Sequence, residues 1–292
     1  MTRGSVIAVL VGAMLGSSGI AAAATAERDR GDRVAGQPDH RAETRALDDL
    51  LQSSGLRVQL DSLTAGVRAQ FLRAHRNQSS HDRLVIDRIV TERFSADILY
   101  SRIKAEFQRD LESGRLQTAL AWYDSPLGKR IIGQELAALV APGGADAVAD
   151  LEQHRPSARR IDLIERLDTG GGASETTVDV TVAIVRSLTV AFQPGLPAVA
   201  GLNRDQLDRQ ITTARNRTLE NMRRICKVSM LLAYRGLSDD ELEQYVQFVE
   251  SDAGRWYMTV MNGALLTAVD AAADSTASEL ATAMPQLVRD LR

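Results

Sequence analysis

The stretch AWYDSPLGKR at residues 121–130 decides the fold that this sequence predicts, and QFVESDAGRW at residues 247–256 repeats its pattern. In each stretch an aromatic residue is followed three positions later by serine, and that serine is followed three positions later by glycine. Serine is a preferred helix N-cap, because its side chain accepts a backbone N–H from the first turn. Pro126 and Asp252 come next, and proline and acidic residues both suit the first turn. Each stretch therefore predicts a corner between two helices.

Glycine inside the first turn of each outgoing helix needs a compensating gain, because it costs about 1 kcal/mol relative to alanine. The preferred explanation is close approach of the preceding helix, through Trp122 or Phe248. A cluster of backbone N–H groups that binds an anion is the alternative. The candidate surface for a partner or ligand is made of the corner residues Trp122, Tyr123, Ser125, Gly128, Phe248, Ser251, Gly254 and Trp256.

The N-terminus has the features of a secretory signal peptide. Arg3 precedes an apolar run over Val6–Leu15, and Ala24-Thr25-Ala26 fits the small-residue cleavage rule. We therefore expect residues 1–26 to be a signal peptide cleaved near Ala26, and the mature protein to be periplasmic or secreted. The polar residues 27–40 are expected to be a disordered spacer. The apolar run is too short to span a membrane, and no transmembrane segment is expected after the leader is cleaved.

Charge and cysteine content restrict the classes of function. The net charge of the 292 residues is −3, whereas nucleic-acid-binding proteins normally carry a basic excess, so no nucleic-acid partner is expected. Cys226 is the only cysteine, so an exported chain has no internal disulfide. Met222 and Met230 lie at helical spacing from it, which favours a buried apolar thiol. A reactive thiol or an intermolecular bridge is the alternative.

From Arg41 onward, apolar residues recur at spacings of three and four, the pattern of amphipathic helices. Gly55 and Gly170 are expected to end the short leucine-rich helices before them. The run of Thr and Val at 176–184 raises a strand alternative, but its context favours a helix. Helices are expected over residues 82–92, 96–112, 116–123, 161–167, 175–192 and 204–234, from the capping box at 238–241 to the second corner, and beyond that corner with a weaker pattern after Asp270.

The two halves of the chain match at a constant shift. Leu116 corresponds to Leu242, Trp122 to Phe248, and each corner serine and glycine to its counterpart. The sequence therefore predicts an all-α helical bundle built from two related helical repeats, stacked or swapped into one body. The first repeat is expected at residues 41–155 and the second at residues 156–292, with a polar linker at 154–160 between the halves.

Residues 122–129, WYDSPLGK, resemble the aromatic–x–x–Ser/Thr-Pro-x-Gly-Gln/Lys signature of bacterial exported proteins in the domain-of-unknown-function family 2059. The second corner departs from that signature, with Asp252 in place of proline. The resemblance would cover most of the mature chain in two copies. It implies an all-α periplasmic domain, and it implies no activity, because that family has no settled one.

The sequence shows no constellation that would carry catalysis. It has no His-x-x-x-His pair, no histidine near Cys226, and no lysine after the three glycines at 170–172. We therefore expect no catalytic residue, metal or cofactor, and a non-catalytic binding or envelope-assembly role with an envelope protein as partner. The alternative is a carrier of an apolar small molecule or lipid in a cleft between the repeats. A hydrolase built around Cys226 is a third hypothesis.

Overall fold

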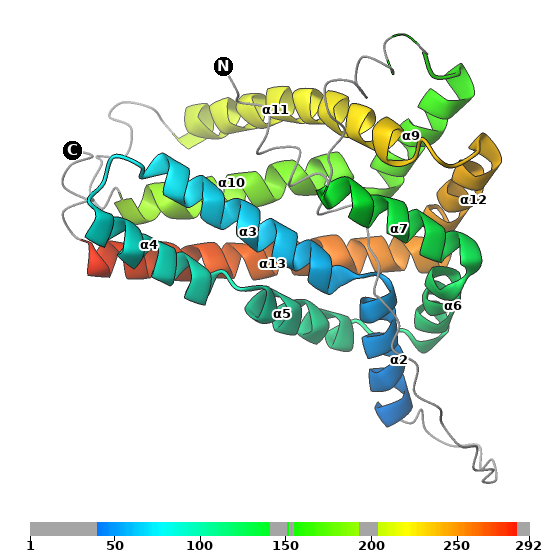
Figure 1. The fold of residues 1–292 in the computed structure, drawn as a ribbon, viewed down its shortest axis with the longest axis horizontal. Coiled ribbons are helices and arrows are strands. Elements are labelled where there is room, and N and C mark those ends of the chain that lie inside the picture. The colour runs from blue at the N-terminus through cyan, green and yellow to red at the C-terminus, as the bar shows by residue number, and fades with distance from the viewer. Residues whose placement is uncertain (1–39, 141–150, 152, 154, 193–203, 285–292) are drawn as a thin grey trace.

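The computed structural model describes residues 40–140, 151, 153, 155–192 and 204–284, and the predicted signal peptide and nearly all of the predicted spacer lie outside them (Figure 1). Almost all described residues are helical and none is in a strand, which confirms the all-α prediction. The helices are α2 His40–Ser53, α3 Leu56–Ala74, α4 Ser80–Arg93, α5 Ala96–Arg109, α6 Ser113–Asp124, α7 Pro126–Val140, α9 Ala158–Gly171, α10 Ala173–Phe192, α11 Arg204–Ala233, α12 Asp239–Val249 and α13 Asp252–Ala283.

Helix α13 runs along the middle of the molecule and is covered by helices from both halves of the chain (Figure 1). It packs against α9, α10 and α12 from its own half, and against α4, α5 and α6 from the other half. Many of its buried residues are alanines, such as Ala268 and Ala272, whose small side chains let neighbouring helices approach closely. The halves therefore share one hydrophobic core.

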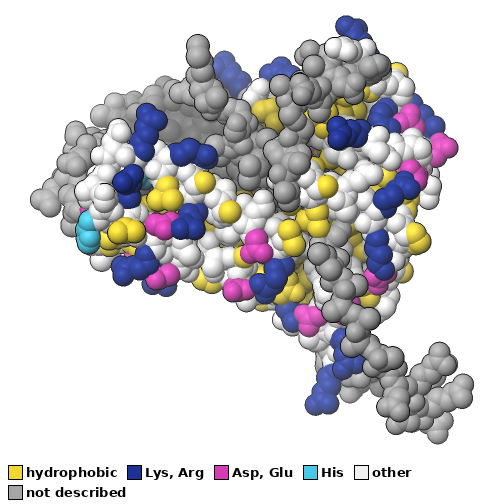
Figure 2. Space-filling view, viewed as in Figure 1, with side chains coloured by type: hydrophobic (Ala, Val, Ile, Leu, Met, Phe, Trp, Pro, Cys, Tyr) yellow, Lys and Arg dark blue, Asp and Glu magenta, His cyan; other side chains and the backbone are white. Residues whose placement is uncertain are grey.

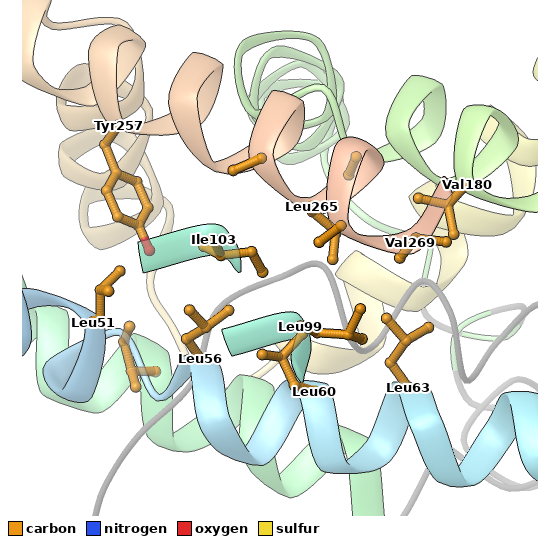
Figure 3. Packing of buried hydrophobic residues seen from close by; sticks show 14 of the residues in the cluster. Leu51, Leu56, Leu60, Leu63, Leu99, Ile103, Val180, Tyr257, Leu265 and Val269 are labelled. Atoms are coloured by element: carbon orange, nitrogen blue, oxygen red, sulfur yellow. The ribbon is translucent and has the colours of Figure 1, made fainter. Parts of the chain in front are cut away.

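Leucines of α3 form one wall of this core. Figure 3 shows Leu60 and Leu63 of α3 facing Leu265 and Val269 of α13, with Leu99 of α5 beside them. All five side chains are at most 8% exposed. The spacings of three and four on α3 therefore do place one apolar stripe against the centre of the molecule.

Two helix ends test the glycine stop signals. Gly55 adopts the left-handed conformation with φ of 61°, as a helix-terminating glycine should. The prediction for Gly170 is wrong, because α9 continues to Gly171 and the left-handed residue is Gly172, with φ of 67°. Gly170 stays helical at a close approach, where a Cβ would lie 2.8 Å from Cγ1 of Val249. Helix α9 also starts at Ala158, inside the predicted linker, with Ser157 as its N-cap.

The Thr and Val run is helical, as expected, because the threonines satisfy their hydroxyls within the helix. Thr177 Oγ1 donates to the carbonyl of Ala173 at 2.7 Å, and Thr181 Oγ1 donates to the carbonyl of Thr177 at 2.8 Å. Such bonds let buried threonine sit on a helix without an unpaired polar atom. Thr177 is therefore fully buried in α10 without cost to its hydrogen bonding.

The two halves begin and end with the same order of elements. A helix, a left-handed glycine and a second helix open each half, as α2–Gly55–α3 and as α9–Gly172–α10. A short helix, a capping serine and a further helix close each half, as α6–Ser125–α7 and as α12–Ser251–α13. Among the described residues, α4 and α5 lie between these pairs in the first half, and α11 lies between them in the second. The duplication itself remains a prediction.

Candidate functional site

The two serine corners have the same hydrogen bonds. Ser125 Oγ accepts the backbone N–H of Gly128 at 3.0 Å, and Ser251 Oγ accepts that of Gly254 at 3.0 Å. Each serine also donates its backbone N–H to the carbonyl of the aromatic residue three positions earlier, at 3.0 Å in both corners. Both serines therefore cap the outgoing helix, as the sequence predicts.

Both corner glycines are required by close approach of the backbone. A Cβ on Gly128 would lie 2.3 Å from the carbonyl oxygen of Trp122, and a Cβ on Gly254 would lie 1.9 Å from that of Phe248. Trp122 and Phe248 are the residues that the sequence indicates. The atoms that come close to the glycines are their carbonyl oxygens, not their rings. The glycine N–H groups are already bonded to serine, which removes one donor from the anion-binding alternative.

The two corners meet at one end of the molecule, which we call the corner end and define as α2, α6, α9 and α12 (Figure 1). Trp122 stacks on Phe248 with ring centroids 4.0 Å apart and planes 8° apart, and on Tyr245 with centroids 5.2 Å apart. These contacts join α6 of one half to α12 of the other. The residues that correspond in the predicted duplication, Trp122 and Phe248, therefore pack face to face.

Two ion pairs support this junction of the halves. Arg115 of α6 donates to Asp252 at the start of α13, with Nε 2.7 Å from Oδ2. Arg130 of α7 pairs with Glu241 of α12. Each pair joins a short helix of one half to the outgoing helix of the other.

The other aromatic residues of the corners lie in the core. Tyr123 is 2% exposed and packs against Tyr257, with ring centroids 5.1 Å apart. Trp256 is 7% exposed, its Nε1 donates to the carbonyl of Asp110 at 3.1 Å, and its ring packs edge-on against Phe107. Trp122, in contrast, is only half-buried. Of the two tryptophans, Trp122 is the more exposed.

A buried carboxyl, which sequence reasoning missed, lies beside this cluster. Glu135 of α7 is 1% exposed, and the hydroxyls of Tyr234 and Tyr245 both donate to its Oε1, the latter at 3.3 Å. Its Oε2 is buried without a hydrogen-bond partner. Burial raises the pKa of Glu135 to about 8, and the bonds from the two tyrosines oppose that rise. Within the described part of the chain, no cation pairs with it.

The sequence did contain a signal for Glu135. Gly128, Ile131 and Ile132 lie seven, four and three residues before it, which places all four on one face of a helix. All four are buried in the structure. A charged residue in the middle of an apolar stripe indicates a buried ionisable group, and such groups gather at functional sites.

A small cavity of about 40 Å³ lies among the tyrosines. Its polar lining residues are Tyr123, Tyr234, Tyr245, Tyr257, Gln59 and Asn262, and three methionines contribute to its apolar wall. Figure 3 shows Tyr257 projecting from α13 toward Leu51, and its hydroxyl is hydrogen-bonded to Ser54 and Tyr123. A water needs roughly 10–15 Å³ of such space, so the cavity has room for water but not for a drug-sized ligand, which needs roughly 300–1,000 Å³.

Cys226 is buried, as its methionine neighbours suggest. It is 0% exposed in a small cluster with Val178, Leu219 and Met222. Burial raises the pKa of the Cys226 thiol to about 12, so the thiol stays protonated at neutral pH. Among the described residues, no group of three His, Cys, Asp or Glu side chains is placed to hold a metal.

Comparison with known proteins adds no assignment. No protein family, curated protein or solved structure was found to match this chain. None of the described helices combines the length and the apolar character that a membrane span requires.

Proposed function

We propose that the protein is a non-catalytic binding protein of the bacterial envelope and that a partner protein docks at the corner end. The incomplete burial of Trp122 carries this proposal. Its stacking on Phe248 and Tyr245 holds it in one orientation, so little conformational entropy is lost when a partner covers it. Tryptophan is also among the residues that contribute most to protein interfaces.

The surroundings of Trp122 support an interface of the usual kind, with an aromatic centre and a polar rim. Lys129 pairs with Asp124 at 3.2 Å next to the first corner, and Arg166 pairs with Glu250 at 2.7 Å next to the second. Figure 2 shows the same mixture of basic and acidic side chains over the face it presents. A mixed surface suits a protein partner better than a nucleic acid.

The envelope location rests on the leader-like N-terminus and on the resemblance of the first corner to exported proteins. Nothing in the geometry of the described corner end needs a catalytic step. The serines cap helices, the glycines admit a backbone oxygen, and the buried rings fill the core. Trp122 is the one aromatic corner residue that is only half-buried.

Site-specific photocrosslinking in cells would test this proposal. A crosslinking side chain is placed at Ala121 or at Gln247, which are exposed beside Trp122 and Phe248. The matched control is Leu84 on α4, an exposed position (69%) at the other end of the molecule. We expect adducts from the two corner positions and none from Leu84, on a mature chain that begins near Glu27.

The partner is then identified by mass spectrometry and its affinity for the purified protein is measured. Trp122→Leu is expected to weaken binding by at least about tenfold, which is about 1.4 kcal/mol. Leu84→Ala should leave the affinity unchanged. Adducts that form equally at Leu84, or an affinity insensitive to Trp122, would contradict docking at the corner end.

The carrier alternative finds less support in the described part of the molecule. The cavity among the tyrosines is about 40 Å³, well below the size of a small-molecule site. A lipid or apolar ligand bound between the repeats would need the halves to separate. Native mass spectrometry of freshly purified protein that showed a bound small molecule would reverse this preference.

A further inference from the structure

Glu135 connects three segments, one of which, α12, belongs to the corner end. It projects from α7, Tyr234 follows the last residue of α11, and Tyr245 belongs to α12. The ring of Tyr245 in turn stacks on Trp122 of α6. The hydrogen bonds of one carboxyl therefore hold together helices from both halves of the chain.

In the part of the chain that the structure describes, no cation compensates a carboxylate at this position. The groups that act on Glu135 are the hydroxyls of Tyr234 and Tyr245. Tyr123 of α6 and Tyr257 of α13 lie near enough for a negative Glu135 to raise their pKa values.

Arginines of two neighbouring helices are already paired with acidic residues of α12. Arg130 of α7 pairs with Glu241 of α12. Arg160 of α9 pairs with Asp239 at 2.7 Å and donates to the carbonyl of Tyr234 at 2.6 Å. On α3, the residue that reaches the cavity is the uncharged Gln59. An ionised Glu135 would therefore be a buried charge stabilised by hydroxyls alone.

We propose that Glu135, Tyr234 and Tyr245 form a proton-controlled latch that holds α7, α11 and α12 together while Glu135 is protonated and releases them when it is ionised. The buried Oε2 has no partner in the packed state, whereas water would solvate it in an opened state. The inference does not depend on the docking proposal. If both proposals hold, ionisation of Glu135 also loosens Tyr245, on which Trp122 stacks.

The direction of the pH effect follows from the two protonation equilibria. The packed state binds its proton up to a pKa of about 8, and an opened, solvated glutamate binds it only up to about 4.3. Between these values opening releases a proton, so the opening equilibrium constant rises about tenfold per pH unit. Below the lower value and above the upper one, the constant is independent of pH.

Amide hydrogen exchange on the full chain measures this constant as a protection factor. From about pH 5 to about pH 9, we expect the amides of α7 and α12 to lose protection about tenfold per pH unit and to level off near pH 8. They should also be less protected than the amides of α13 at the far end, between Ala268 and Leu280. Equal protection in both places would mean that Glu135 only affects global stability, and would overturn the latch.

Two variants separate the carboxyl from its surroundings. Glu135→Gln keeps an acceptor for both tyrosines and should make protection of α7 and α12 independent of pH. Glu220→Gln, the same change at an exposed position of α11, should keep the wild-type profile. A pH dependence that persists in Glu135→Gln would overturn the proposal.

Tyr234→Phe provides the test if Glu135→Gln does not fold. It removes a hydrogen bond that favours the carboxylate, which raises the pKa of Glu135 further. The pH above which protection stops falling should therefore be higher than in the wild type. A purely structural role for Tyr234 predicts lower protection at every pH with no such movement, and that result would overturn the latch.

Discussion

Two glycines of α13 show that the effect of glycine on stability depends on its surroundings. Gly254 lies at the second corner, where a Cβ would be 1.9 Å from the carbonyl oxygen of Phe248. Gly263, nine residues later in the same helix, is exposed and has no atom within 4 Å of a would-be Cβ. The first glycine therefore determines the corner, and the second only weakens the helix.

We expect Gly254→Ala to destabilise the protein by about 1–3 kcal/mol, because the corner must open to admit the methyl group. The matched change Gly263→Ala should stabilise it by up to about 1 kcal/mol, since alanine is the better helix former. Denaturant unfolding of both variants measures the difference. Equal effects of the two changes would show that the corner is not tightly closed.

At this scale the sequence indicated the caps and the corner glycines, because their chemistry is local. Sequence reasoning missed Glu135, although its place in the stripe of Ile131 and Ile132 was a signal. Charged residues on helices are usually exposed, and only the arrival of Tyr234 and Tyr245 from distant segments makes this burial tolerable. The binding role of the eight corner residues remains a prediction.

At the scale of elements, the two corners reach the same geometry with different residues in the first helical position. Ser125 is followed by proline and Ser251 by aspartate, yet both serines accept the glycine N–H at 3.0 Å. The capping box predicted at Ser238 and Glu241 is also present. Helix starts are thus read well from sequence, because a cap needs only neighbouring residues.

Ser125→Ala and Ser251→Ala should each cost about 1 kcal/mol of unfolding free energy, because each leaves a backbone N–H of the first turn without its acceptor. Ser278→Ala is the control, since Ser278 is exposed within α13 and alanine suits a helix interior. Thermal or denaturant unfolding provides the measurement. A loss in Ser278→Ala as large as that of the caps would contradict this assignment.

Helix ends and faces that depend on tertiary contacts were harder to predict. Three consecutive glycines follow α9, and the helix continues through Gly170, which packs closely on Val249, to Gly171, with Gly172 as its cap. The pattern after Asp270 is weak because the buried face of α13 there is made mainly of small residues, Ala272, Ala273, Thr276 and Ala277, although they follow one stripe.

At the scale of the whole molecule, we expect stability to depend on the packing of helices from one half against helices of the other. Helix α13 belongs to the second half, yet α4, α5 and α6 of the first half cover it. The sequence allowed stacked or swapped halves, since a repeat pattern does not state which copy packs on which. The single shared core is therefore a finding of the structure.

We expect that residues 41–155 and 156–292, produced separately, will not unfold cooperatively. The first fragment would expose the faces of α4, α5 and α6 that pack on α13, and the second would expose the matching surface of α13. Co-expressed, the two fragments should associate and recover a sigmoidal unfolding curve. Size-exclusion chromatography with circular dichroism would follow both states. A cooperative transition in either fragment alone would show that the predicted repeats are independent domains.

The position of α13 in the chain has a consequence for synthesis. A ribosome delivers α13 after every other described helix, so the walls of the core exist before the helix that fills it. Until then the leucines of α3 and α5 have no cover, and partly made chains are prone to aggregate. The molecule should therefore acquire its tertiary structure late, after most of its length has emerged.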